Sequence, residues 1–101
     1  PYTTLFRSIM DDLREKCPWD QKQTLQSLRH LTLEEVYELS DAILMEDLTE
    51  IKKELGDVLL HLVFYARIGS EKNQFDIAFL FYFLHWLVLC QLQFLQRTIG
   101  R

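Results

Sequence analysis

The sequence predicts an all-α fold, on two observations of composition and one of local pattern. Of 101 residues only three are glycine and two are proline, while 49% are apolar and 26% are charged. Few turn-forming residues beside many apolar ones are typical of a helical domain. Helix-start signatures, in which a side-chain acceptor is followed three residues later by Glu or Gln, recur at Asp20, Thr32 and Asp47. A domain this small buries only part of its surface, so we expect the fold to be completed by oligomerisation.

The N-terminal part of the chain has two distinct pieces. Residues 1–8 match the in-frame translation of a widely used sequencing-adapter oligonucleotide. We interpret them as a non-native segment and leave them out of the fold prediction; the alternative is a genuine lead-in to a helix. The apolar pattern of Ile9–Glu15 predicts the last turns of a helix. Cys17-Pro18 ends it, because proline disfavours the helical conformation in the residue before it.

Three further helices are expected before the C-terminal segment, each opened by one of the start signatures. A polar turn separates the last of them from the apolar tail. The expected bounds are 21–28 for the first helix, 32–46 for the second, 47–72 for the third and 70–74 for the turn.

The stretch from Leu33 to Asp57 concentrates the acidic residues. Nine of the fifteen Asp and Glu residues lie in it against two lysines, which gives a local charge of −7 in a chain of net charge −4. At 100° per residue, the four acids of the first row fall within about a third of the helix circumference. Those of the second row, continued by His61, fall within about a sixth of it. Both rows border the apolar stripe instead of lying opposite it. The rows are Glu34, Glu35, Glu38 and Asp41, then Glu50, Glu54 and Asp57.

Carboxylates arranged in this way need a counter-charge. Like charges at i,i+4, such as Glu34 with Glu38, destabilise a helix, and partial burial strengthens the repulsion. A divalent cation relieves it, and carboxylate oxygens select hard ions, here Mg²⁺ with Mn²⁺ as the alternative. The spacing by itself is equally compatible with an ordinary charged helix surface.

The segment 77–101 differs in composition from everything before it. It contains no acidic residue and six of the thirteen aromatic residues, and His85 is the one clearly polar residue within 77–90. We expect a buried or interface helix here, although a helix that is apolar all round is out of place on the surface of a small domain. A membrane span through Phe79–Leu95 is the less favoured alternative, because its length is borderline.

Charge and cysteine content exclude other classes of protein. The acidic balance, without a basic stripe in the sequence, argues against a nucleic-acid polymer as partner. Cys17 and Cys90 lack the spacing of a metal or redox motif, which fits free thiols in the reducing cytoplasm.

The segment 9–76 contains C-P-W-D at 17–20 and E-x-x-E followed, after fifteen residues, by E-x-x-D. With these motifs the segment resembles the MazG family of nucleoside triphosphate pyrophosphohydrolases. The resemblance implies a four-helix-type bundle that forms a homodimer or homotetramer and binds Mg²⁺ between two helices. It also implies hydrolysis of a nucleoside triphosphate to the monophosphate and pyrophosphate. The metal ligands implied are Glu35, Glu38, Glu54 and Asp57.

The same resemblance assigns roles around the metal. Glu34 or Glu38 serves as the base for the attacking water, and the sequence does not choose between them. Trp19, Asp20 and Lys22 belong to the nucleotide side, with Trp19 as a wall for the base; the alternative for Trp19 is a buried anchor at a chain turn.

Two residues within the second acidic row have bland alternatives. Gly56 is interpreted as allowing close approach of two helices, the alternative being a tolerated helical glycine that costs about 1 kcal/mol. His61 is interpreted as a supporting or core histidine in preference to a metal ligand.

The tail departs from the family. Members usually carry a basic segment there that contacts phosphates, and 77–101 has none of it. A frameshift near Ile77 explains both the missing motif and the change of composition. If the frameshift interpretation is wrong, Lys53, Arg67 and Lys72 are the first cations to examine for binding the triphosphate. The main alternatives to an enzyme are a catalytically inactive helical oligomerisation module of the same fold and a membrane-associated helical protein.

Overall fold

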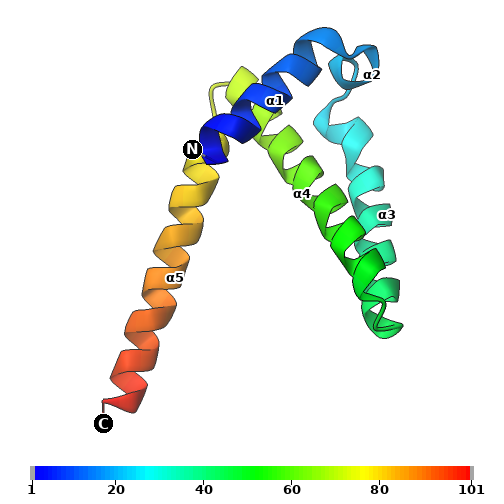
Figure 1. The fold of residues 1–101 in the computed structure, drawn as a ribbon. Coiled ribbons are helices and arrows are strands. Elements are labelled where there is room, and N and C mark those ends of the chain that lie inside the picture. Colours follow the sequence, from blue (N-terminus) through cyan, green and yellow to red (C-terminus); the bar gives the residue numbers. More distant parts are fainter. Residues whose placement is uncertain (1, 101) are drawn as a thin grey trace.

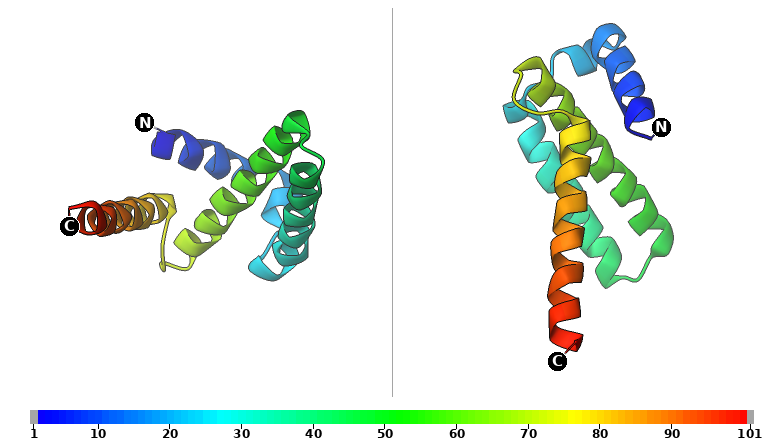
Figure 2. Two further views of the ribbon diagram at one scale, coloured as in Figure 1. Left: turned by 90° about the horizontal axis from the view of Figure 1, so that it is seen from below. Right: turned by 90° about the vertical axis from the view of Figure 1, so that its left-hand side faces the viewer.

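The computed structural model describes residues 2–100, and these form five helices (Figure 1). Helices α3 and α4 run antiparallel as a hairpin, α1 crosses one end of it, and α5 projects away from the body. The left view of Figure 2 shows the same separation of α5 from the hairpin. The bounds are α1 Tyr2–Lys16, α2 Pro18–Gln21, α3 Leu25–Leu44, α4 Leu48–Glu71 and α5 Ile77–Ile99.

The break after α1 and the start of α4 follow the local signals in the sequence. Cys17 is extended, with φ −92° and ψ 116°, and Pro18 takes the first position of α2. Asp47 caps α4, because its side chain accepts a hydrogen bond from the backbone N–H of Glu50 at 3.2 Å. Glu46, immediately before it, has the left-handed φ of 54° that closes the turn between α3 and α4.

The predicted start of α3 is wrong. Thr24 is its N-cap: the Thr24 hydroxyl accepts from the N–H of Ser27 at 3.0 Å, and Ser27 accepts from the N–H of Thr24 at 2.8 Å. The expected helix over 21–28 and the expected start at Thr32 are therefore replaced by one helix of 20 residues. The reciprocal cap with serine at the third position escapes a search for Glu or Gln at that place.

A small apolar core joins α1, α3, α4 and the start of α5. Phe64 is 1% exposed and Leu28 is wholly buried, so these two residues anchor α3 against α4. Phe6, within the segment interpreted as non-native, packs on this core and stacks on Phe81 with 6.4 Å between ring centroids. The core consists of Met10, Leu28, Val63, Phe64, Ala66, Ile68 and Ile77.

Arg14 ties three elements together at the α1 end of the hairpin. Its guanidinium donates to both carboxylate oxygens of Glu71 at 2.8 and 2.9 Å, and to the backbone carbonyls of Asp20 and Gln23 at 2.6 and 2.9 Å. It also lies 5.5 Å from the centroid of the Phe64 ring. This hydrogen bonding lowers the pKa of Glu71, and the side chain of Arg14 is 15% exposed. A half-buried bidentate pair of this kind contributes more than an exposed one.

We expect Arg14→Ala to lower the free energy of unfolding by about 2–4 kcal/mol, because two backbone carbonyls lose their donor and the Glu71 carboxylate loses one of its two arginine partners. Urea denaturation followed by circular dichroism measures this. Arg29→Ala, which removes an exposed arginine of α3, is the control and should change stability by less than about 0.5 kcal/mol. Equal effects of the two substitutions would contradict the role of Arg14.

Helix α5 is almost entirely solvent-exposed. Ile77 is its one buried residue, Leu80 is partly buried against the core, and residues 81–100 are exposed. The helix has a mean hydropathy of 1.7 over its most apolar window, of which 6% is buried. By length and composition it is able to cross a membrane, a property that buried core helices of soluble proteins share. As a result, the prediction of a buried helix is not met within this single chain.

The molecule is more open than a compact domain of its size. Its radius of gyration is 16.7 Å, against about 13 Å for a compact 100-residue domain. Its accessible surface is 8113 Å², against about 6,000 Å² for a folded monomer of 12.1 kDa. Large apolar faces of the hairpin and of α5 account for this excess.

Candidate metal centre

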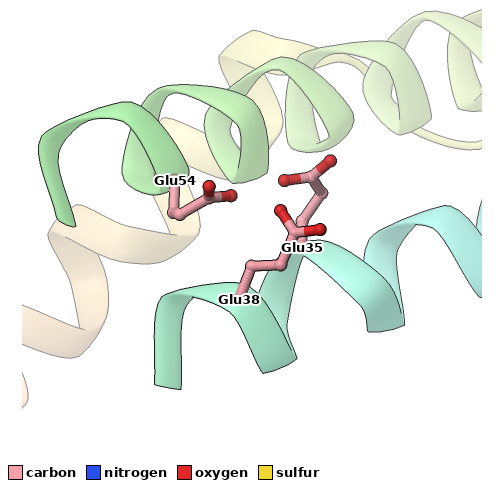
Figure 3. Close-up of side chains that lie close together, drawn as sticks. All are labelled: Glu35, Glu38 and Glu54. Atoms are coloured by element: carbon pink, nitrogen blue, oxygen red, sulfur yellow. The ribbon is translucent and has the colours of Figure 1, made fainter. Parts of the chain in front are cut away.

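Three of the predicted ligands converge where the middle of α3 faces the N-terminal half of α4. Glu35 and Glu38 are three residues apart and share one face of α3, and Glu54 points toward them from α4 (Figure 3). One carboxylate oxygen from each of the three residues lies within 4.8 Å of the other two. Glu54 is 3% exposed. The site is thus a set of oxygens between two helices, closed on one side by burial.

Burial leaves two of these oxygens without partners. Within residues 2–100, Oε2 of Glu35 and Oε2 of Glu54 are the buried side-chain oxygen or nitrogen atoms that have no hydrogen-bond partner. An unsatisfied buried carboxylate oxygen is costly unless it coordinates a cation. Mg²⁺ and Mn²⁺ take carboxylate oxygens in this way. The residues present therefore fit a hard divalent cation.

The pKa values show the same mutual repulsion. The pKa of Glu35 is raised to about 7, first by its hydrogen bond to Glu54, and then by burial and by the charge of Asp57. The pKa of Glu38 is also raised, chiefly by the charge of Glu54. That of Glu54 is lowered by the hydrogen bond from Glu35, although burial opposes this. These shifts show that the three carboxylates do not all carry a full negative charge at once near neutral pH.

Lys53 supplies positive charge beside the carboxylates. Its ammonium lies 3.2 Å from Oε1 of Glu54 and 3.9 Å from Oδ2 of Asp57. Asp57, the fourth predicted ligand, is 41% exposed and lies outside the group of three. Its carboxylate faces the lysine, so the structure brings together three of the four predicted ligands and places Asp57 beside them.

An open pocket of about 390 Å³ extends from Glu38 and Glu54 toward the turn between α3 and α4. Five acidic side chains line it, and Lys53 is the one cation among its lining residues. A triphosphate carries several negative charges and would be repelled from such a pocket unless cations neutralise it. The lining residues are Glu38, Asp41, Ala42, Met45, Asp47, Glu50, Lys53 and Glu54.

The other predicted site residues lie elsewhere. Glu34 is exposed and outside the group of three, so Glu38 is the candidate base that the structure places among the converging carboxylates. Trp19 is 53% exposed and Asp20 is 8% exposed, both on α2, and Lys22 follows directly. Ten residues of α3 separate Leu25 from Glu35, about 15 Å along the helix axis. Within one chain, the predicted nucleotide residues do not reach the carboxylates.

Two of the three cations considered for phosphate binding are also remote. Arg67 lies thirteen residues beyond Glu54 on α4, about 20 Å along the axis, and is paired with Asp11 and Glu71. Lys72 lies one turn further still, at the end of α4. Of these cations, Lys53 alone adjoins the carboxylates.

The interpretation of Gly56 is wrong for this chain. A Cβ atom added at Gly56 would meet nothing within 4 Å, so no close helix contact requires a glycine there. Two residues beside the site were missed from the sequence: Thr32 and Tyr65, which hydrogen-bond to each other across the two helices with His61. The sequence predicts Thr32 as a helix cap, and the i,i+4 spacing of His61 and Tyr65 is the pattern that indicates a shared helix face.

Comparison with known proteins shows the family of this chain. Residues 23–82 match the MazG nucleotide pyrophosphohydrolase domain, which extends six residues past the expected boundary at Asp76. The nucleoside triphosphate pyrophosphohydrolase of Escherichia coli K12 is 46% identical over 72 residues, which cover 68% of this chain and 27% of that protein. The nucleoside triphosphate pyrophosphohydrolase/pyrophosphatase MazG of Thermotoga maritima is 50% identical over 72 residues, 69% of this chain and 28% of that protein.

The fold is shared with a solved structure. The crystal structure of a mazG-related protein from Thermotoga maritima superposes with a TM-score of 0.71, at 21% identity, over 84% of this chain and 75% of that one. The likeness confirms the predicted all-α fold. The chain spans about a quarter of the length of the two curated relatives. With a domain match over more than half of its residues, the chain belongs to the MazG nucleotide pyrophosphohydrolase domain family.

Proposed function

We propose that this chain is a metal-dependent nucleoside triphosphate pyrophosphohydrolase domain, which cleaves its substrate into the nucleoside monophosphate and pyrophosphate. The observation that carries the proposal is the convergence of Glu35, Glu38 and Glu54 with two orphaned buried oxygens. Such an arrangement favours Mg²⁺, with Mn²⁺ as the alternative. The names of the relatives supply the substrate class.

The residues of the site divide the work. Glu35, Glu38 and Glu54 hold the cation, and Asp57 is the fourth carboxylate within reach once Lys53 turns away. A bound divalent cation would neutralise phosphate charge and make a coordinated water more acidic. Glu38, or Glu34 beside it, takes the proton of the attacking water.

Lys53 and the α2 residues complete the proposed site. When a cation occupies the carboxylates, the ammonium of Lys53 is repelled from Glu54 and is free to contact a phosphate oxygen. Trp19, Asp20 and Lys22 are proposed to contact the nucleotide. Their distance from the carboxylates within one chain is consistent with a site that needs more than a single copy.

We propose a homodimer or homotetramer because the isolated chain exposes more surface than a compact monomer of its size. The surface in excess of a compact monomer is about 2,000 Å², whereas a standard interface buries about 800 Å² on each partner. Exposed apolar residues of the hairpin, among them Leu33, Val36, Leu55 and Leu59, form the face to be covered. Light scattering coupled to gel filtration tests this.

The alternative function is a catalytically inactive oligomerisation module with the same fold. It is favoured by one observation: Lys53 is the one cation lining a pocket of five acids, so few groups are present to bind a triphosphate. Such a module would form the oligomer and would not turn over nucleotides.

The test is hydrolysis of nucleoside triphosphates with and without Mg²⁺, with products resolved by ³¹P nuclear magnetic resonance. Monophosphate and pyrophosphate in equal amounts, lost on addition of EDTA, are the expected result. Diphosphate and inorganic phosphate would contradict the bond assignment. A defined oligomer without turnover would favour the inactive module.

Metal-free stability is expected to fall as the pH rises from about 5 to 8. The pKa of Glu35 is near 7 in the folded chain and 4.5 in the unfolded one. The folded state therefore binds more protons in this window and loses stability as they leave. Millimolar Mg²⁺ should replace the proton and raise the melting temperature more at pH 8 than at pH 5.5.

Thermal denaturation across this range checks the expectation. Burial lowers the pKa of His61, which gives an opposite slope below about pH 6.5. Glu35→Gln is the matched variant, because it keeps His61 and removes Glu35, while Glu38, whose pKa is also raised, still contributes to the decline. If the decline were as large in that variant as in the original chain, Glu35 would not be its main source.

For the domain organisation, we propose that residues 9–76 are the functional core and that 77–101 are a frameshifted tail, with 1–8 non-native. Exposure of 81–100 supports a tail that does not match the core. Because the family match ends at residue 82, we place the change of reading frame between Ile77 and Phe83. Sequencing the genomic reading frame across Phe75–Phe83 decides it.

We further propose a cytoplasmic location with no membrane and no nucleic-acid polymer as partner, in keeping with an acidic surface and a nucleotide substrate.

A further inference from the structure

A polar cluster lies in the seam between α3 and α4, beside the candidate metal centre. Oγ1 of Thr32 is 2.8 Å from Nδ1 of His61 and is hydrogen-bonded to the hydroxyl of Tyr65. It also donates to the backbone carbonyl of Leu28 at 3.1 Å. His61 is buried, and Thr32 and Tyr65 are half-buried. One hydroxyl thus joins two residues of the opposite helix.

The hydrogen-bonding capacity of this hydroxyl is fully used. A threonine hydroxyl has one proton and two lone pairs. With its proton donated to Leu28, it accepts from the hydroxyl of Tyr65 and from an Nδ1–H of His61. Valine, which has the same shape, would leave the tyrosine and the histidine without this acceptor.

The position of the cluster links it to the carboxylates. Thr32 precedes Glu35 by three residues on α3, and His61 follows Asp57 by four and Glu54 by seven on α4. These spacings place the residues on the same helix faces, about one or two turns from the carboxylates. Among residues 2–100, the hydrogen bonds of Thr32 to His61 and Tyr65 join α3 to α4 outside the group of three carboxylates.

We infer that Thr32 is a positioning residue for the metal centre. By joining α3 to His61 and Tyr65 of α4, it holds Glu35 and Glu38 opposite Glu54 against the repulsion of the three carboxylates. The inference rests on the proposed metal site, in that positioning has a functional consequence only if a cation binds there. Outer residues that orient ligands typically change metal affinity by about 10–100-fold.

The experiment compares Thr32→Val with Thr32→Ser in the full chain. Titration calorimetry with MgCl₂ at a temperature where every variant is folded gives the affinity. Thr32→Val should weaken Mg²⁺ binding about tenfold or more, and Thr32→Ser, which keeps the hydroxyl, should bind within about twofold of the original chain. Asp76→Ala is the control: it removes the cap of α5, at the far end of α4, and should destabilise the chain without changing Mg²⁺ affinity.

A second measurement needs no metal. In the metal-free chain, Thr32→Val should speed amide hydrogen exchange at 35–39 and 54–58, and neither Thr32→Ser nor Asp76→Ala should do so there. Unchanged exchange in the valine variant would overturn the inference, as would unchanged Mg²⁺ affinity in a chain that binds Mg²⁺. If the original chain bound no Mg²⁺, the proposed metal function would fail, and the exchange pattern would still decide whether Thr32 holds these segments in place.

Discussion

Glu54→Gln is expected to abolish Mg²⁺-dependent hydrolysis, with a loss of at least about a hundredfold. A metal clamp contributes several kcal/mol to phosphoryl chemistry, and each 1.4 kcal/mol corresponds to a tenfold change in rate. Glu54 is the most buried of the three converging carboxylates, and one of its oxygens has no other partner. Water therefore has the least access to this position to take over the role of the lost carboxylate.

The fold should survive this substitution. Glutamine has the same shape, its amide can donate to Glu35, and removing one negative charge lessens the repulsion with Glu38. Circular dichroism should show unchanged helical content, and the metal-free melting temperature should not fall. Asp12→Asn, a charge-matched change on exposed α1, should leave hydrolysis intact. Loss of the helical signal in Glu54→Gln would make this residue structural.

The chain as it stands is expected to self-associate, because α5 offers an uncovered apolar surface. Residues 81–100 are exposed along a helix that contains no charged residue before Arg97. An exposed apolar surface of this extent is an aggregation liability. Sedimentation velocity at micromolar concentration should show polydisperse species larger than the proposed dimer or tetramer, which associate through α5.

A variant with four substitutions in α5 tests this expected self-association without changing the net charge. Tyr82→Glu with Trp86→Lys, and Cys90→Glu with Phe94→Lys, place two opposite-charge pairs at i,i+4 on the exposed helix. This variant should sediment as a single defined species. The control is Leu80→Ala, which changes a residue that packs on the core and should not improve solubility.

A chain with a family-like basic, amphipathic segment after Asp76 should be soluble as well and should gain activity. The reason is that it would add the phosphate-binding cations that the pocket lacks. If the original chain proved to be a monodisperse hydrolase with ordinary phosphate affinity, the frameshift interpretation would be wrong, and Lys53 would have to suffice for the triphosphate.

Local signals explain which helix bounds could be predicted. Asp47 and Pro18 act on residues within one turn of themselves, so their effect is visible in sequence. The start of α3 was missed because two capping patterns lie eight residues apart, at Thr24 and Thr32. Thr32 is drawn into the helix because its hydroxyl has better partners on α4.

The acidic site also has some features that the sequence predicts and others that it does not. The periodicity of the acids and the spacing of the two motifs put Glu35 and Glu38 on one helix face and Glu54 on another. The side-chain direction of Asp57 was not predictable, because it depends on the lysine one turn before it. The distance of Trp19 from the carboxylates depends on the length of α3. The sequence predicts a shorter helix that starts at Thr32, so this distance could not be predicted.

By itself, the sequence determined that the chain is helical, where α1 ends and α4 begins, and that acids border the apolar stripes. Each of these depends on interactions among residues a few positions apart. Only the tertiary structure decided that Glu54 is buried, that Thr32 joins the two helices, and that most of α5 finds no partner within this chain. These depend on how one helix rotates against another, which is set by core contacts such as Leu28 with Phe64, between residues far apart in the sequence.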